Sequence, residues 1–243
     1  MEVAFTDRDG GVSNGAFSSL NLAPVGLDDR EHVQQNLVRV MEAFAGSADA
    51  SAALMHQVHG DQVAVVGRGP GADVAPSAVT VGVDDLARVD GLVTAEPEVT
   101  LVVRVADCVP LLLAADDGEV VGALHVGRAG LVGGIVAAGL EAMAAAGAAR
   151  CTAWLGPSVC GSCYEVPAAL REEVCRTVPA AWAETSWGTP SVDVAAGVRA
   201  QLAEAGVEVV DASLCTREHE ELFSYRRDGE HAGRMAGLVR IRR

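Results

Sequence analysis

The sequence contains no lysine, and all 18 cationic side chains among its 243 residues are arginines. This absence excludes Schiff-base chemistry on a lysine amine and the phosphate-binding lysine of a P-loop. A phosphate bound by this chain would have to be held by arginine side chains, by backbone N–H groups or by a metal ion.

Positive charge is scarce overall, because the net charge is −15. A protein that binds a nucleic-acid duplex needs a positive face, so we expect no nucleic-acid partner. From Arg217 to Arg243 seven arginines face five acids, a local +2 that leaves −17 over the first 216 residues. This segment is either a solvated basic tail or a source of arginines for an anionic substrate.

Segments typical of export and membrane insertion are also missing. The first residues lack a basic region followed by an apolar stretch, so no signal peptide is visible. Gly130–Ala149 is apolar but rich in Gly and Ala and interrupted by Glu141, which is typical of a buried helix. We therefore expect a cytoplasmic protein with no membrane partner and with its six cysteines reduced.

No linker or internal repeat divides the chain, and we predict a single domain over residues 1–243. Predicted strands and helices alternate, which favours an α/β fold with a mixed β-sheet core flanked by helices. The predicted strands are Ala53–Val58, Gln62–Val66, Thr100–Val105, Leu111–Ala114, Val120–Val126 and Thr152–Leu155. The predicted helices are Glu31–Phe44, Leu131–Ala146, Ala168–Thr177 and Val194–Ala205.

The strongest local pattern is a β-hairpin. An apolar run over Leu111–Ala115 and another over Glu119–Val126 flank Asp116-Asp117-Gly118, and an Asp-Gly turn between apolar runs is typical of a hairpin. Counting back from the turn brings Cys108 within one or two positions of residues 125–127. We therefore predict that Cys108 and His125 lie side by side at the open end of the hairpin.

A neighbouring Cys and His allow three interpretations. They can be a thiolate nucleophile with its base, two ligands of a metal such as zinc, or a buried thiol beside a structural histidine. Asp107 argues against the last, since an acid seldom stands next to a core strand unless it orients a neighbour or holds a loop.

His59 is the candidate for a third ligand. His56 and His59 end another apolar run, and on a strand they point to opposite faces, so both can hardly bind one ion. His59 precedes Gly60, where the chain can turn, whereas His56 is interpreted as structural. Three protein ligands leave the fourth tetrahedral position open, which is the arrangement of catalytic zinc.

A glycine-rich turn follows His125 and leads into the predicted helix. Gly127-Arg128-Ala129-Gly130 would bring free N–H groups and Arg128 towards the metal, an anion-binding arrangement, although such a turn is commonly only a turn.

Several motifs in fixed order support a family resemblance. They are Phe5-Thr6-x-Arg8-x-Gly10-Gly11-Val12-Ser13, Ser19-Leu20-Asn21-Leu22, Gln57-Val58-His59-Gly60, Asp90-Gly91-Leu92-Val93-Thr94, Ala106-Asp107-Cys108-Val109-Pro110-Leu111, Cys163-Tyr164-Glu165-Val166, Phe223-Ser224-Tyr225-Arg226-Arg227-Asp228-Gly229 and Gly233-Arg234-Met235-Ala236. On these motifs the chain resembles the YfiH/YlmD family. Members are labelled laccase-domain or polyphenol oxidases and are described as zinc-dependent purine nucleoside phosphorylases that also deaminate adenosine.

The resemblance implies a fold similar to that of a toxin deamidase and a metal bound by His59, Cys108 and His125. It further implies a purine nucleoside substrate (adenosine, inosine, guanosine or methylthioadenosine) with inorganic phosphate as co-substrate and zinc as cofactor. Tyr164 and Tyr225 are candidate stacking surfaces for the purine. The candidate substrate contacts are Arg8, Asn21, Arg128, Tyr164, Arg226 and Arg227.

The chain departs from the family pattern at three positions. Arg128 replaces a Trp, Ala129 replaces a basic residue, and Leu37 replaces an Arg expected after Asn36. These changes concern how phosphate or substrate is held.

Three alternatives remain open. Copper in the same site would give polyphenol oxidase activity, although six histidines are too few for a four-copper laccase. Cys108 with His125 as base would give a cysteine hydrolase. The departures at positions 37 and 129 would favour a non-catalytic nucleotide-binding protein.

Cys160 and Cys163 form a C-x-x-C pair, typical of a redox or zinc site. No second C-x-x-C completes a tetrahedral site, so we interpret the segment as a structural or substrate-lining loop, and Cys151, Cys175 and Cys215 as small core residues. The sequence does not indicate an oligomeric state.

Overall fold

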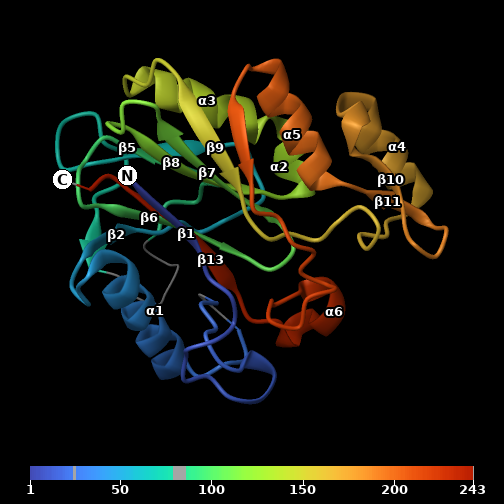
Figure 1. The fold of residues 1–243 in the computed structure, drawn as a ribbon, viewed down its shortest axis with the longest axis horizontal. Helices are drawn as coiled ribbons and strands as arrows, with labels where there is room; N and C mark the ends of the chain where they lie inside the picture. Colours follow the sequence, from blue (N-terminus) through green and yellow to red (C-terminus); the bar gives the residue numbers. More distant parts are fainter. Residues whose placement is uncertain (24–25, 79–85, 243) are drawn as a thin grey trace.

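A computed structural model describes residues 1–23, 26–78 and 86–242. Two mixed β-sheets pack face to face, and helices cover both outer faces (Figure 1). In the described residues one sheet has the strand order β1-β13-β6-β2-β4 and the other β12-β9-β7-β8-β5-β3. The strands are β1 Glu2–Phe5, β2 Ser51–Ala53, β3 Val63–Val66, β4 Ser77–Ala78, β5 Gly91–Thr94, β6 Thr100–Val105, β7 Val109–Ala115, β8 Val121–Val126, β9 Cys151–Leu155, β10 Trp182–Glu184, β11 Pro190–Val192, β12 Glu208–Asp211 and β13 Met235–Arg240. The helices are α1 Arg30–Ala45, α2 Arg128–Gly133, α3 Ile135–Ala145, α4 Ala168–Thr177, α5 Val194–Glu204 and α6 Tyr225–Asp228, with short 3₁₀ turns η1 Gly15–Phe17, η2 Pro179–Ala181 and η3 Gly229–His231.

Strand β7 shows how the two sheets share the core. Leu111 and Leu113 pack against the layer of α2, α3 and α5, whereas Leu112 and Ala114 pack against the sheet β1-β13-β6-β2-β4. Because successive strand side chains point to opposite faces, a strand covered on both sides must be apolar throughout. This explains the unbroken apolar run of β7.

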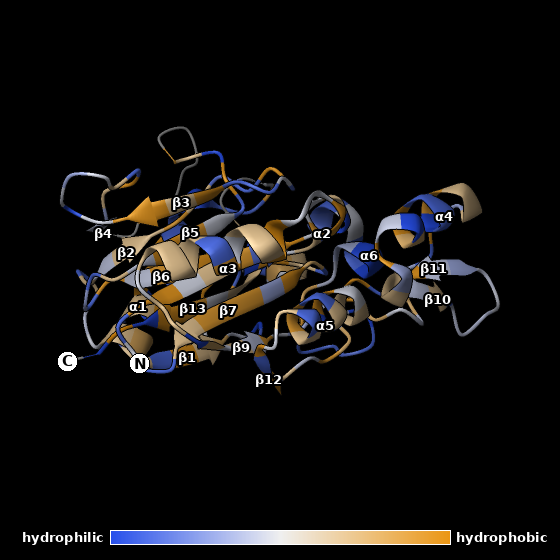
Figure 2. Cartoon of the chain, turned by 90° about the horizontal axis from the view of Figure 1, so that it is seen from above, coloured by the Kyte–Doolittle hydropathy of each residue, from blue (hydrophilic) through white to orange (hydrophobic). Residues whose placement is uncertain are grey.

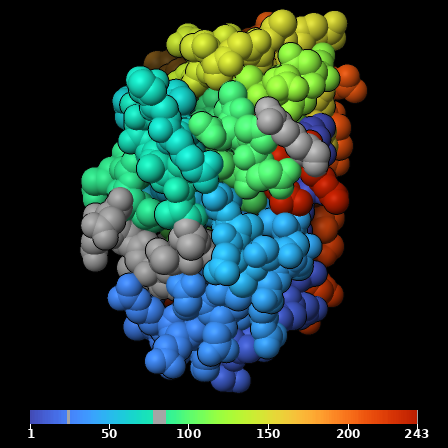
Figure 3. Space-filling model, turned by 90° about the vertical axis from the view of Figure 1, so that its left-hand side faces the viewer, coloured from blue at the N-terminus to red at the C-terminus, as the bar shows by residue number. Residues whose placement is uncertain are grey.

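Helix α1 covers the outer face of the sheet β1-β13-β6-β2-β4. Leu37 and Met41 pack against Val102 of β6 and Leu238 of β13. In Figure 3, α1 (blue) and the residues that follow α3 (yellow) lie at opposite ends of the molecule. The predicted α/β class with a mixed sheet core flanked by helices is therefore confirmed.

Most predicted elements occur in the structure, with one predicted helix divided and one predicted strand misplaced. Residues 131–146 form α2 and α3, because Gly134 has φ 97° and interrupts the helix. The strand predicted at Ala53–Val58 is wrong beyond its first residue: the observed strand is Ser51–Ala53, and residues 54–58 lie outside the sheets. The strands β1, β4, β5, β10, β11, β12 and β13 were not predicted.

The chain ends lie next to each other because β1 pairs with β13 in antiparallel register (Figure 1). Helix α4 and the two-stranded sheet β10-β11 extend from one end of the sandwich, where hydrophilic residues become frequent (Figure 2). No helix in the described part of the chain is long and apolar enough to cross a bilayer.

Candidate metal centre and pocket

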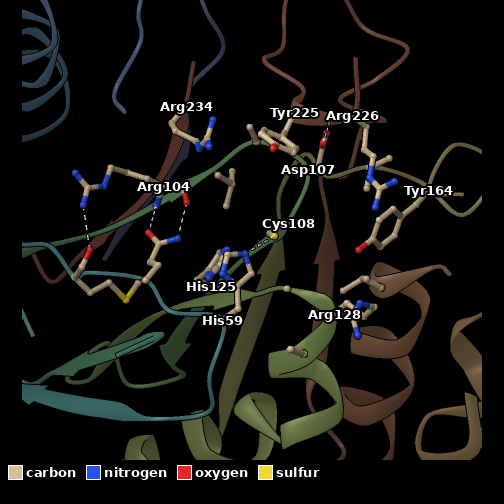
Figure 4. A pocket seen from close by; sticks show the side chains of 18 of the residues that line it. His59, Arg104, Asp107, Cys108, His125, Arg128, Tyr164, Tyr225, Arg226 and Arg234 are labelled. Carbon is tan, nitrogen blue, oxygen red and sulfur yellow. Dashed lines mark hydrogen bonds between the residues drawn. The ribbon is translucent and has the colours of Figure 1, made fainter. Parts of the chain in front are cut away.

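The structure brings the three predicted ligand residues together from separate elements. His59 lies in the loop between β2 and β3, Cys108 in the turn where the chain crosses from β6 to β7, and His125 near the end of β8. Pro110 pairs with His125, so Cys108 lies at the open end of the hairpin, as predicted. The ligand atoms of these three residues all lie within 4.8 Å of one another, and Cys108 Sγ is 3.8 Å from His59 Nε2 (Figure 4).

Asp90 holds two of these ligands in place. Its fully buried carboxylate accepts a 2.7 Å hydrogen bond from Nδ1 of His125 and further bonds from the backbone N–H groups of Val58, His59 and Gly60. Burial alone would raise the pKa of Asp90, but the His125 and backbone hydrogen bonds outweigh it and lower that pKa. A carboxylate therefore fixes the ring of His125 and the loop that carries His59.

Gly127 leaves room for the other two ligands. A Cβ at this position would lie 2.7 Å from Cδ2 of His59 and 3.3 Å from Sγ of Cys108. Any side chain here would displace the His59 ring, so glycine is required by close approach rather than by its backbone freedom.

Cys108 and His125 form a charged pair when no metal separates them. Burial would raise the pKa of Cys108, yet the charge and hydrogen bonds of His125 and His59 lower it to about 6. Burial would lower the pKa of His125, yet Cys108 and Asp90 raise it to about 9. At neutral pH the sulfur is therefore a thiolate, the form that binds a metal or acts as a nucleophile.

The three residues fit a borderline-soft metal ion. Two imidazoles and a thiolate are ligands that zinc prefers, and ligands of a tetrahedral zinc lie about 3.5 Å apart, near the separation of Cys108 and His59. With Nδ1 of His125 bonded to Asp90, its Nε2 remains for the metal. The group supplies three ligands and leaves a fourth position towards the cavity.

Asp107 holds a loop rather than a histidine. Its carboxylate accepts hydrogen bonds from the Oγ atoms of Thr216 and Ser224 at 2.6 and 2.7 Å and from the backbone N–H of Arg226 at 2.6 Å. Its φ of 89° lies in the left-handed region that favours glycine, and these bonds stabilise the sharp turn before Cys108. Of the two roles predicted for Asp107, it holds a loop, whereas Asp90 orients the histidine.

A cavity of about 700 Å³ opens over the three ligands. Four arginines and one acid, Asp107, line it among the described residues, and both oxygens of Asp107 are already bonded within the protein. The lining residues are Met55, His56, Gln57, His59, Arg104, Val105, Ala106, Asp107, Cys108, His125, Gly127, Arg128, Ala129, Val159, Tyr164, Val194, Tyr225, Arg226 and Arg234.

Two of these arginines, Arg104 and Arg234, were not predicted as site residues. Arg104 is 4 % exposed, and its Nη1 has no hydrogen-bond partner among the described residues. Burial, and then the charge of Arg234, lower the pKa of Arg104 to about 10. An arginine within the apolar strand Thr100–Val105 was the sequence signal that could have identified it.

The remaining polar wall lies on the opposite side of the ligands. Figure 4 shows Arg104 and Arg234 on one side of His59 and His125, and Tyr164, Arg226 and Arg128 on the other. The guanidinium of Arg226 stacks over the Tyr164 ring at 4.3 Å. The predicted contacts Arg128, Tyr164 and Arg226 thus line the cavity.

Arg8, Asn21 and Arg227 do not line this cavity. The guanidinium of Arg8 donates to the backbone carbonyls of residues 16, 18 and 220. Asn21 is fully buried and accepts the backbone N–H of Arg234, and Arg227 donates to the carbonyls of residues 216, 217, 219 and 222. Their polar atoms hold loops together outside the cavity lining.

The departures from the family pattern lie in different surroundings. Leu37 of α1 is 2 % exposed, packs in the core and does not line the cavity. Arg39, two positions after Leu37 on α1, is the nearest arginine that follows the lost one. It donates to the carbonyl of Gly10 and does not line the cavity. Arg128 and Ala129 both line it, at the start of α2.

Comparison with known proteins gives consistent results. The family model described as multi-copper polyphenol oxidoreductase laccase matches residues 2–242. A purine nucleoside phosphorylase (ORF3) of Streptomyces griseus is 49% identical over 97% of this chain and 92% of its own length. The chain belongs to the YfiH/YlmD family. The crystal structure of YlmD from Geobacillus stearothermophilus has a TM-score of 0.84 at 30% identity, covering 99% of this chain and 92% of that one.

Other members of the family agree in name and in fold. A purine nucleoside phosphorylase (SCO2081) of Streptomyces coelicolor is 47% identical over 97% of this chain and 93% of its own length. The structure of NMB0706 from Neisseria meningitidis has a TM-score of 0.81 at 30% identity, covering 99% of this chain and 94% of that one. Of the six histidines, only His59 and His125 belong to a metal-compatible group in the described residues, which does not suit the several-copper cluster in the family's description.

Proposed function

We propose that the chain is a zinc-dependent purine nucleoside phosphorylase, with adenosine deaminase as a second activity of the same pocket. Adenosine, inosine, guanosine and methylthioadenosine are the proposed nucleosides, inorganic phosphate is the co-substrate, and residues 1–243 act as one catalytic domain. The relatives named as phosphorylases support the reaction class.

The single observation that carries the proposal is the positive charge of the cavity. In a chain of net charge −15, Arg104, Arg128, Arg226 and Arg234 line one pocket, and none of them forms an ion pair within the described residues. A buried guanidinium without an acidic partner is costly unless a ligand supplies the negative charge. Phosphate is an anion of suitable size and charge.

The pocket divides naturally between the two substrates. We place phosphate on the side of Arg104 and Arg234, where the unpartnered Nη1 lies. The purine is placed towards Tyr164, whose ring offers a stacking surface, whereas Tyr225 lies beside Arg234 on the phosphate side. With phosphate at the arginines and the purine at the tyrosine side, C1′ of the nucleoside faces phosphate. Phosphorolysis then breaks the C1′–N9 bond while a phosphate oxygen bonds to C1′.

His59, Cys108 and His125 would hold the zinc. When bound, zinc supplies a Lewis acid with an open position and lowers the pKa of water, which suits hydrolytic loss of ammonia from adenosine. The chain's own contribution is orientation. The hydrogen bond to Asp90 keeps the proton on Nδ1 of His125 and thereby fixes which ring nitrogen faces the metal. The arginines balance the charge of phosphate as the glycosidic bond breaks.

Chromatography of adenosine incubated with purified protein, with and without phosphate, tests the proposal. We expect adenine only with phosphate and inosine without it, and neither product with Cys108→Ala. Cys151→Ala is the matched control, since Cys151 lies on β9 away from the cavity, and it should retain both activities. Absence of both products with unmutated, zinc-loaded protein would refute the nucleoside assignment.

A second candidate, a cysteine hydrolase, is favoured by one observation. The Cys108 thiolate, the His125 imidazolium and the Asp90 carboxylate form a series of nucleophile, proton-carrying histidine and orienting carboxylate. Zinc analysis separates the two functions, because a thiolate that ligates a stoichiometric metal is not free to attack. Stoichiometric copper instead of zinc would favour the polyphenol oxidase alternative.

A further inference from the structure

A second group of metal-compatible side chains lies beside the pocket. Ligand atoms of Cys160, Cys163, Cys215 and Glu218 all lie within 4.8 Å of one another. Cys163 and Cys215 are buried, Cys160 is partly buried and Glu218 is exposed. The sequence showed only the C-x-x-C pair, because the other two residues follow more than fifty positions later.

The four residues come from two turns of the same construction. The N–H of Cys163 donates to the carbonyl of Cys160 at 3.0 Å, and the N–H of Glu218 donates to the carbonyl of Cys215 at 3.1 Å. Both turns therefore present side chains three positions apart on one side. Two such turns facing each other form the usual framework of a structural zinc site, with glutamate here replacing a fourth cysteine.

Backbone hydrogen bonds hold the two turns side by side. The N–H of Ser158 donates to the carbonyl of Leu214 at 3.0 Å, and the N–H of Thr216 donates to the carbonyl of Ser158 at 3.1 Å. Arg227 closes the second turn, since its guanidinium donates to the carbonyls of Thr216 and Arg217. The framework is therefore ordered by the fold and independent of an ion.

We propose that Cys160, Cys163, Cys215 and Glu218 bind a second zinc ion, in a structural site. Three sulfurs and a carboxylate oxygen satisfy all four tetrahedral positions, so this site is closed, whereas His59, Cys108 and His125 leave a position open. The 3.3 Å between Cys163 Sγ and Glu218 Oε1 is close to the about 3.5 Å expected between sulfur and oxygen ligands of one zinc ion.

The second zinc would stabilise one wall of the catalytic pocket. Val159, next to Cys160, donates its N–H to the carbonyl of Asp107, and Thr216, next to Cys215, bonds the Asp107 carboxylate. Tyr164 follows Cys163 and lines the cavity. An ion bound by both turns would thus add a further link, beyond these hydrogen bonds, next to Tyr164 and the turn before Cys108, without contacting substrate.

Zinc content per chain, measured by mass spectrometry after zinc loading and buffer exchange, tests the site. We expect two zinc ions in unmutated protein, one in Cys108→Ala, one in Cys215→Ser and none in the double variant. Cys151→Ser is the matched control and should keep two. A Cys215→Ser protein with the full zinc content would overturn the proposal, and it would do so whether or not phosphorylase activity exists.

Alkylation of the unmutated protein covers the case in which Cys215→Ser does not fold. Mass spectrometry of peptides should show Cys160, Cys163 and Cys215 protected in zinc-loaded protein and modified after chelation. Equal modification in both states would overturn the proposal. A native mass lower by the two hydrogens of a disulfide, with these cysteines joined, would identify a redox pair and would equally overturn it.

Discussion

Asp90 accepts a 2.7 Å hydrogen bond from Nδ1 of His125 while its two oxygens also bind the backbone around His59. One buried carboxylate therefore sets the ring nitrogen that His125 turns towards Cys108 and the conformation of the loop that brings His59 to the same point. His59 has φ 61°, a left-handed conformation that these hydrogen bonds stabilise.

Replacing Asp90 by Asn should weaken zinc binding at His59, Cys108 and His125 about 10- to 100-fold, because the His125 ring loses its anionic partner. Protection of the Cys108 thiol from alkylation, followed over buffered zinc concentrations, measures occupancy of this group alone. Asp116→Asn, at an exposed turn, is the control and should not change the protection curve. An unchanged curve for folded Asp90→Asn would contradict the positioning role.

Gly127→Ala should abolish activity, because the new methyl group would lie 2.7 Å from Cδ2 of His59. The ring must move, and the metal site loses its geometry. Gly69→Ala is the matched control, since a Cβ there meets nothing within 4 Å, and its stability should change by less than about 0.5 kcal/mol. Product formation from adenosine and zinc content are the measurements, and normal values for Gly127→Ala would refute the steric argument.

Arg234→Met should raise the KM for phosphate about 10- to 100-fold, as expected for loss of a hydrogen-bonded charge. Phosphate-independent formation of inosine should change much less, since that reaction needs no anion. Arg39→Met, whose guanidinium bonds the carbonyl of Gly10 outside the cavity, should behave as unmutated protein. Equal loss of both activities in Arg234→Met would point to a purely structural role.

The thiol of Cys108 should be unusually reactive in zinc-free protein. Although burial opposes it, His125 and His59 lower its pKa to about 6, so the thiolate predominates above that pH. Alkylation rates should therefore rise with a midpoint near pH 6. Cys151 provides the internal comparison, because burial and then Asp116 raise its pKa and it should react only in alkaline solution. A midpoint for Cys108 in the ordinary thiol range would contradict the charged pair.

Asp211 should contribute a small, pH-dependent stability. Burial opposes the shift, but Arg199 and Ser213 lower the pKa of Asp211 from 3.8 to about 2. A lowered carboxyl pKa stabilises the fold above the unfolded value, and this contribution disappears as pH falls from 3.8 to about 2. Both side chains of the pair are more than a third exposed, so Asp211→Asn should cost less than about 1 kcal/mol at neutral pH.

Urea unfolding of both proteins over a range of pH measures this difference. The gap between unmutated protein and Asp211→Asn should be constant near neutrality and should narrow below about pH 4. Glu208→Gln, on the exposed β12 strand, is the control and should follow the unmutated protein. A gap that widens on acidification would contradict the lowered pKa.

Local sequence patterns determined the elements whose structure depends on neighbours in the chain. Helix α4 has the predicted bounds, Ala168–Thr177, and strand β6 has the predicted Thr100–Val105. The β7–β8 hairpin was predictable because an Asp-Gly turn sets the register of the strands beside it. That register alone placed Cys108 beside His125.

Only the tertiary structure decided how distant segments complete the site. Asp90 lies 35 positions before His125, and although it opens one of the family motifs, the local pattern does not show that its carboxylate contacts His125. Strand β13 exists because β1 and β6, far away in sequence, bind its two edges. Non-local pairing of this kind leaves no periodic pattern, since it depends on which surfaces meet when the core forms.

The same division holds for the polar residues around the pocket. The sequence determined which residue types are available, above all a chain whose only strong cations are arginines, and it identified His59, Cys108 and His125 as candidates. The structure decided which arginines face the cavity: Arg104 and Arg234 do, whereas Arg8 and Arg227 bind backbone carbonyls elsewhere. Side-chain direction follows from packing and hydrogen bonding in three dimensions, and residue type alone does not specify it.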